Sequence, residues 1–197
     1  MKVAIGFKAH SGWAAAVVVG LRGGEFEIVD RRRVELVDVE WAKAPYHAAE
    51  EMKPEAARKL IGRGVEAANR IAVRELRAMV ERERERGNAP SALALLAGAP
   101  MPPWSVDEIR AVHFRMHKAE GAMFRDALAR AAGECGVSLV AIPEKELAAQ
   151  AEAGLGMSVK TLSKLLGAFG KSVGAPWGKD QKDAALAAMI ALKRRPA

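Results

Sequence analysis

The sequence predicts an α/β fold built on a mixed five-stranded sheet, with three antiparallel strands followed by two parallel ones and helices on both faces. Three strand-like segments with short turns open the chain, and two further short apolar segments each follow a long helical pattern. Strands reached across a helix join a sheet in parallel, through right-handed crossovers. The 197 residues, half of them apolar, are enough for a single domain over 1–197.

The first two strands are expected over 2–8 and 13–20, which are rich in Val and Ile and are separated by a polar turn. Apolar and polar residues partly alternate over 25–37. Such alternation is typical of a strand with one solvated face. The three segments therefore predict an antiparallel meander.

A first long helix is expected over 55–86, where apolar residues recur at helical spacing before Gly87, with a break allowed at Gly62 and Gly64. The preceding residues 41–54 read as a connector or a short helix. The apolar run 91–98 follows Pro90 and predicts a fourth, buried strand.

A capping box of Ser105 and Glu108 predicts the start of a second long helix over 106–132. The apolar residues 137–142 predict the fifth strand. Three shorter helices are expected to complete the chain, over 144–154, 158–173 and 180–195. The last has acids in its first turn and bases in its last, as the helix dipole favours.

The chain is basic, with a net charge of +7 and a pI near 9.8. Two interpretations stay open: a nucleic-acid or other polyanionic partner, and an arginine surplus spread over solvated helix faces. Cys135 is the single cysteine, which excludes an intrachain disulfide and a cysteine-based zinc site. A reducing, cytoplasmic location is expected. No apolar stretch reaches the roughly 18 residues of a membrane span.

Two stretches of the sequence carry a family resemblance: "VAIGFKAHSGWAAAVV" (3–18) and "DQKDAALAAMIAL" (180–192). The first resembles the opening hairpin, and the second the last helix, of one branch of the ribonuclease H-like superfamily. That branch contains the RuvC and YqgF-like Holliday-junction resolvases. The order of the predicted elements extends this resemblance over most of the chain.

The resemblance implies a nuclease site with two divalent metal ions, Mg²⁺ or Mn²⁺, held by carboxylates from the first strand, the fourth strand and the last helix. This sequence departs from that pattern. Lys8 stands where the first aspartate is expected, and the fourth strand contains no acid. Asp180 and Asp183 remain, one helical turn apart.

We therefore predict a protein that has lost the two-metal site and acts as a nucleic-acid or partner binding module. Lys8 is expected to form a salt bridge with Asp183 in the vacated metal position, because an unpaired lysine in a sheet centre is costly. Alternatively, Lys8, His10 and Ser11 bind an anion or a nucleotide phosphate in their turn. Trp177 either stacks a base or covers the core.

A second hypothesis is a metal-dependent nuclease or phosphodiesterase with relocated ligands. His113 and His117 are four residues apart in the predicted second long helix, a spacing that suits metal ligands, and Glu120 follows. A site of His117, Glu120, Asp180 and Asp183 would bind Mn²⁺, Zn²⁺ or Fe²⁺, with the three acids as the catalytic groups.

Two other interpretations of this helix remain. In the first, His113 is partly buried, and Glu120 pairs with Lys8 or Arg125. In the second, the same side chains line a polar pocket without metal. By analogy with dimeric members of the branch, the apolar region 93–104 also suggests a homodimer.

Overall fold

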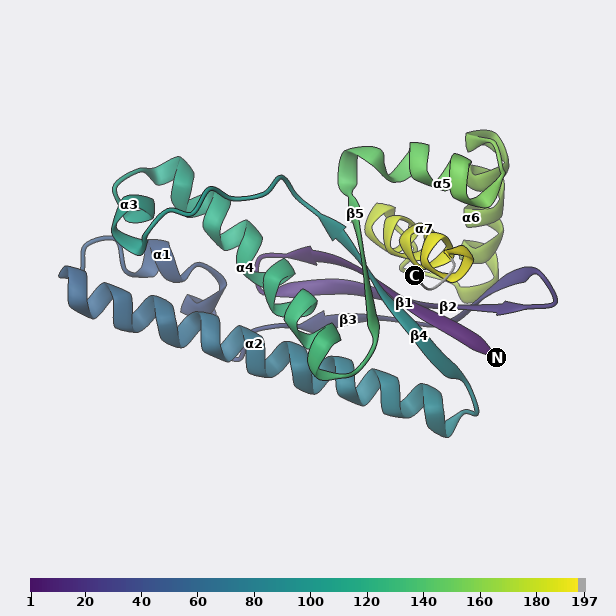
Figure 1. The fold of residues 1–197 in the computed structure, drawn as a ribbon, viewed down its shortest axis with the longest axis horizontal. Helices are drawn as coiled ribbons and strands as arrows, with labels where there is room; N and C mark the ends of the chain where they lie inside the picture. Colours follow the sequence, from purple (N-terminus) through teal and green to yellow (C-terminus); the bar gives the residue numbers. More distant parts are fainter. Residues whose placement is uncertain (195–197) are drawn as a thin grey trace.

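The computed structural model describes residues 1–194 and contains one five-stranded sheet in the order β3-β2-β1-β4-β5 (Figure 1). The strands are β1 (Lys2–His10), β2 (Trp13–Arg22), β3 (Glu25–Glu35), β4 (Ala89–Ala97) and β5 (Ser138–Pro143). The first three pair antiparallel, and β4 and β5 join β1 in parallel. The predicted fold class, with three antiparallel strands followed by two parallel ones, is confirmed.

Helices cover both faces of the sheet (Figure 1). On one face, Val3, Ile5 and Phe7 of β1 pack against α2 (Pro54–Glu85) and α4 (His113–Glu134). On the other, Ala4 shares a core with helices from the second half of the chain. These helices are α5 (Leu147–Leu155), α6 (Val159–Val173) and α7 (Lys179–Lys193). The alternation of side chains along β1 thus directs Lys8 to the same face as Ala4.

Helix α7 lies very close to the centre of β1, and Gly6 permits this contact. A Cβ atom at Gly6 would lie 1.9 Å from the carbonyl oxygen of Ala184. No side chain fits there, so the glycine is required for close packing rather than for an unusual backbone conformation. The consequence is that the first turn of α7 sits over the carboxyl end of β1.

Several helix boundaries differ from the sequence prediction. Helix α2 runs unbroken through Gly62 and Gly64. The single helix predicted over 106–132 is wrong: α3 (Val106–Arg110) and α4 are separate, because Val112 has an extended backbone. The capping box of Ser105 and Glu108 forms as expected.

The connector over 41–54 contains two short helices, η1 (Glu40–Lys43) and α1 (Pro45–Ala48). A further short turn, η2 (Glu144–Glu146), leads from β5 into α5. The predicted end of the last helix, at residue 195, lies outside the described residues.

A third apolar cluster joins α1 to the first half of α2, to α3 and to the start of α4. Its buried members include Tyr46, Ile61, Ile109 and Met116. These elements extend the molecule beyond the carboxyl ends of β1 and β4 (Figure 1). Within residues 1–194, no helix combines the length and the hydropathy that crossing a membrane requires.

Candidate functional site at the carboxyl end of the first strand

The ammonium of Lys8 is the centre of a cluster of carboxylates at the carboxyl end of β1. Its Nζ lies 2.8 Å from Asp183 Oδ2, 2.9 Å from Glu144 Oε1 and 3.4 Å from Asp180 Oδ1. The Lys8 side chain is only 10% exposed. The expected salt bridge between Lys8 and Asp183 is confirmed, and the hairpin and the last helix meet as that expectation required.

The charged state of Lys8 is stabilised by its partners. Burial by itself lowers the pKa of Lys8, because it removes water from the ammonium. Hydrogen bonds to Asp183 and Glu144 act in the opposite direction and outweigh burial, so the pKa of Lys8 lies above its ordinary value. Lys8 is therefore a permanent cation at neutral pH.

The two aspartates of α7 have further partners around Lys8. Lys179 also contacts the Asp183 carboxylate from one turn earlier in the helix. His10 Nε2 lies 3.0 Å from Asp180 Oδ2, and the His10 ring stacks on Trp13 with ring centroids 4.3 Å apart. The polar groups of the opening hairpin and of α7 thus form one connected site.

Glu144 was not identified from the sequence as a site residue. It follows β5 directly, and Pro143 at the end of that strand pairs with Ala97 at the end of β4. Carboxyl ends of neighbouring parallel strands meet at one sheet edge, so its position after the fifth strand was an available signal.

The fourth strand offers no carboxylate to this cluster. Phe7 pairs with Leu95, so the next residue, Leu96, stands level with Lys8, and Leu96 belongs to the apolar core on the α7 face. At this level, β1 supplies the ammonium of Lys8 and β4 supplies the isobutyl group of Leu96. Within residues 1–194, the carboxylates around Lys8 come from α7 and from the turn after β5.

The surface beside the cluster is rich in lysine. Residues 158–182 contain five lysines and a single acid, Asp180. A pocket of about 350 Å³ between α6 and α7 is lined by Lys179, Lys182 and Asp183 together with leucines of both helices. The site thus combines neutralised carboxylates with adjacent exposed cations.

The predicted four-residue metal site does not form. Asp180 and Asp183 lie at the Lys8 cluster, whereas His117 lies beside His47 and His113. The reason is that α7 and α4 pack on opposite faces of the sheet.

Glu120 accepts hydrogen bonds from His47, so its predicted pairing with Lys8 or Arg125 is wrong. His113 is exposed, not partly buried as one interpretation expected.

The remaining predicted residues occupy different settings. Ser11 is exposed in the hairpin turn. Trp177 donates its indole N–H to the carbonyl oxygen of Leu166 at 2.7 Å and packs against the core of the α7 face. A Cβ atom on Gly170 would lie 2.4 Å from the Trp177 ring. This position matches the interpretation of Trp177 as a core cover.

Comparison with solved structures identifies the fold. The structure of Thermus thermophilus RuvC matches with a TM-score of 0.54 and 17% identity, covering 97% of this chain and 93% of that one. T. thermophilus RuvC in complex with a Holliday junction substrate matches with a TM-score of 0.53 and 15% identity, over the same shares of both chains. No protein-family model and no curated protein sequence matches. The chain has the RuvC-like ribonuclease H fold that the two sequence stretches predicted.

Proposed function

We propose that this chain, which has a RuvC-like ribonuclease H fold, binds nucleic acid and has lost the two-metal site that would cleave it. The observation that carries the proposal is the position of the Lys8 ammonium among Asp180, Asp183 and Glu144. A cytoplasmic location is part of the proposal.

The ammonium competes with a metal ion for the same carboxylate oxygens. Mg²⁺ requires several oxygen ligands at about 2.0–2.1 Å in octahedral geometry. Here each carboxylate already has an oxygen within 3.4 Å of Lys8 Nζ, and Asp183 also contacts Lys179. A divalent ion entering this space would meet a fixed positive charge a few ångströms away. Lys8 thus supplies the positive charge that a metal ion would otherwise supply, but an ammonium is not a Lewis acid and does not activate water as a metal ion does.

The same arrangement favours contact with phosphates. Because Lys8 offsets the carboxylates, a phosphate backbone near this edge meets less repulsion than it would at three free acids. The lysines of α6 and the start of α7 add exposed positive charge beside it. In one of the two similar structures, T. thermophilus RuvC is in complex with a Holliday junction substrate. A branched or bent duplex is therefore the first ligand to test.

The test measures binding and cleavage on the same substrates. Four-way junction, duplex and single-stranded DNA are titrated with the protein between about 50 and 200 mM salt, where each phosphate contact contributes a slope of about −0.9 in log K against log salt. We expect a clearly negative slope and intact DNA with Mg²⁺ or Mn²⁺. A flat slope would argue against phosphate contacts, and cleavage abolished by Asp183→Asn would overturn the loss of the nuclease.

A matched pair of variants locates the surface. Lys160→Gln/Lys164→Gln removes two exposed charges from α6, and Lys53→Gln/Lys59→Gln removes two exposed charges at the start of α2. The first variant should reduce the salt slope by about 2 and the second should leave it unchanged. Equal effects would place the binding surface elsewhere. Sedimentation of the wild type in the same buffers tests the predicted homodimer.

A further inference from the structure

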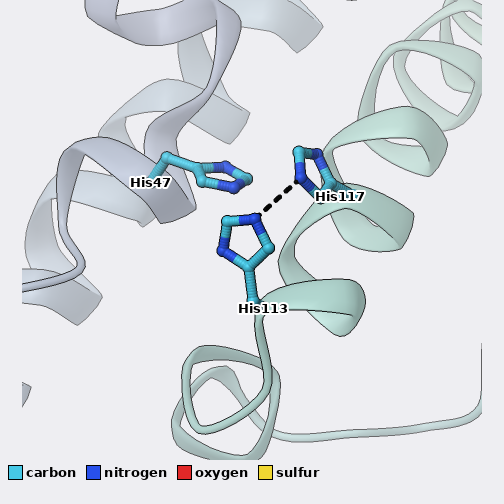
Figure 2. A group of neighbouring side chains, drawn as sticks. All are labelled: His47, His113 and His117. Carbon is cyan, nitrogen blue, oxygen red and sulfur yellow. Dashed lines mark hydrogen bonds between the residues drawn. The ribbon is translucent and has the colours of Figure 1, made fainter.

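Three of the four histidines of the chain gather at one place, where α1 meets the start of α4 (Figure 2). One ligand nitrogen from each of His47, His113 and His117 lies within 4.8 Å of the other two. Nε2 of His113 and Nε2 of His117 are 3.1 Å apart. Figure 2 shows the three rings converging, with His47 coming from one helix and His113 and His117 from another. The cluster lies beyond the sheet and shares no residue with the Lys8 site.

The orientation of His47 is fixed by a buried carboxylate. His47 Nδ1 lies 2.7 Å from Glu120 Oε2, and Glu120 is 4% exposed. The other oxygen of Glu120 accepts hydrogen bonds from the backbone N–H groups of Tyr46 and His47, at 2.9 and 3.1 Å. These donors hold Glu120 as an acceptor, so Nδ1 of His47 carries the proton. Nε2 of His47 then presents a lone pair.

That lone pair has no partner within residues 1–194. His47 Nε2 is buried and makes no hydrogen bond there. The centroid of the His47 ring lies 4.5 Å from that of His117 and 5.0 Å from that of His113. A buried, unpaired acceptor costs free energy unless something binds it. At zinc sites, a ligand histidine usually donates its Nδ1–H to a carboxylate in this way and binds the ion through Nε2.

The spacing suits a tetrahedral ion. Zn–N bonds of about 2.0–2.1 Å at tetrahedral angles place ligand nitrogens about 3.3 Å apart. The 3.1 Å between Nε2 of His113 and Nε2 of His117 is already near that value. The ligand nitrogen of His47 lies within 4.8 Å of the other two, and small side-chain rotations shorten these distances to the same value. His113 and His117 are exposed on adjacent turns of α4, so these rotations meet little resistance.

We propose that His47, His113 and His117 form a binding site for a divalent transition metal, with Zn²⁺ as the expected occupant and Glu120 as the positioning residue for His47. Neutral imidazoles without a thiolate suit Zn²⁺, Co²⁺ or Ni²⁺ and discriminate against Mg²⁺. Three protein ligands leave the fourth position to water or an exogenous anion. The ion would also link α1 to α4. The site is independent of the proposed function at Lys8.

The test uses the full chain without a histidine tag. We expect calorimetric titration with Zn²⁺ to show one ion bound per chain, and Co²⁺ to give the intense visible absorption of a tetrahedral site. His113→Gln/His117→Gln should abolish both signals and the Zn²⁺-dependent rise in melting temperature. His10→Gln, which changes the one histidine outside the cluster, is the matched control and should bind as the wild type does.

Glu120→Gln separates the positioning role from ligation. It should weaken Zn²⁺ binding about 10- to 100-fold while one ion still binds, as the loss of a carboxylate that orients a ligand histidine does. His113 and His117 are exposed, so the double variant keeps the proposal testable if Glu120→Gln does not fold. Absence of saturable Zn²⁺ binding by the wild type would overturn the proposal. Binding unchanged in His113→Gln/His117→Gln, or lost equally in His10→Gln, would do the same.

Discussion

Replacing Lys8 with methionine removes the charge and keeps most of the side-chain volume, which isolates the ammonium in the carboxylate cluster. The variant leaves Asp180, Asp183 and Glu144 near one another without their shared cation. Asp183 is only 16% exposed, so water compensates it poorly, although Lys179 still contacts it. We therefore expect a loss of stability from an uncompensated carboxylate rather than from a cavity.

The magnitude follows from burial. Removing one partner of a fully buried ion pair costs about 3–5 kcal/mol. Glu144 is 51% exposed and Asp183 retains Lys179, so the expected cost lies below that range, at about 2–3 kcal/mol. For a chain of this size, that change lowers the melting temperature by about 5–10 °C.

Urea denaturation followed by circular dichroism measures this cost, with Lys164→Met as the control, because Lys164 is an exposed lysine of α6. Adding Asp183→Asn to Lys8→Met should recover part of the loss and give a coupling energy of about 1–2 kcal/mol. If Lys8→Met had the same urea midpoint as Lys164→Met, the salt bridge would not stabilise the fold, contrary to this prediction.

Three further outcomes are expected. The pKa of Lys8 is raised in the folded state, so its contribution to stability is complete below pH 10.5 and declines as the pH rises above that value. Above pH 10.5 the urea midpoint of the wild type should therefore fall faster with pH than that of Lys8→Met. Equal declines would contradict this expectation. Gly6→Ala should destabilise the protein by about 1–3 kcal/mol, because the new methyl group would overlap the Ala184 carbonyl. Gly62→Ala has open space around it and should stabilise α2 by about 0.5–1 kcal/mol. Calorimetry distinguishes the two variants, and equal melting temperatures would count against the close approach of α7. Trp177→Phe should lower the melting temperature, since it removes the hydrogen bond to Leu166, and should leave DNA affinity unchanged. Weaker DNA binding by the fully folded variant would instead support base stacking as the role of Trp177.

The sheet and the Lys8 pairing were predictable because both depend on regular patterns. Strand periodicity and the strand–helix–strand order determine which chain ends share a sheet edge. Once β1 is central and α7 packs on it, a lysine pointing to that face requires an acid, and Asp183 lies on the covering helix. The cost of burying an unpaired charge thus allows a contact to be predicted from the position of a lysine in the sequence.

Other parts of both sites depended on irregular segments. The position of Glu144 follows from the turn after β5, and that of His47 from the four-residue helix α1 in a connector without periodicity. Val112 interrupts an otherwise continuous helical pattern, which turns His113 into the first residue of α4. Glu120 and His117 were recognised as candidate metal-site residues, but their partner His47 comes from a segment whose path no repeat or motif specifies.

Whether the ammonium of Lys8 excludes a metal ion is tested by a Mn²⁺ titration of Lys8→Asp and of the protein with Lys8 intact, both in the His113→Gln/His117→Gln background so that the histidine cluster does not contribute. Lys8→Asp places a fourth carboxylate with Asp180, Asp183 and Glu144 in the space of the ammonium. We expect Lys8→Asp to gain saturable Mn²⁺ binding, together with a metal-dependent rise in melting temperature, and the protein with Lys8 intact to show neither. Equal Mn²⁺ binding with Lys8 present, or none by folded Lys8→Asp, would contradict it.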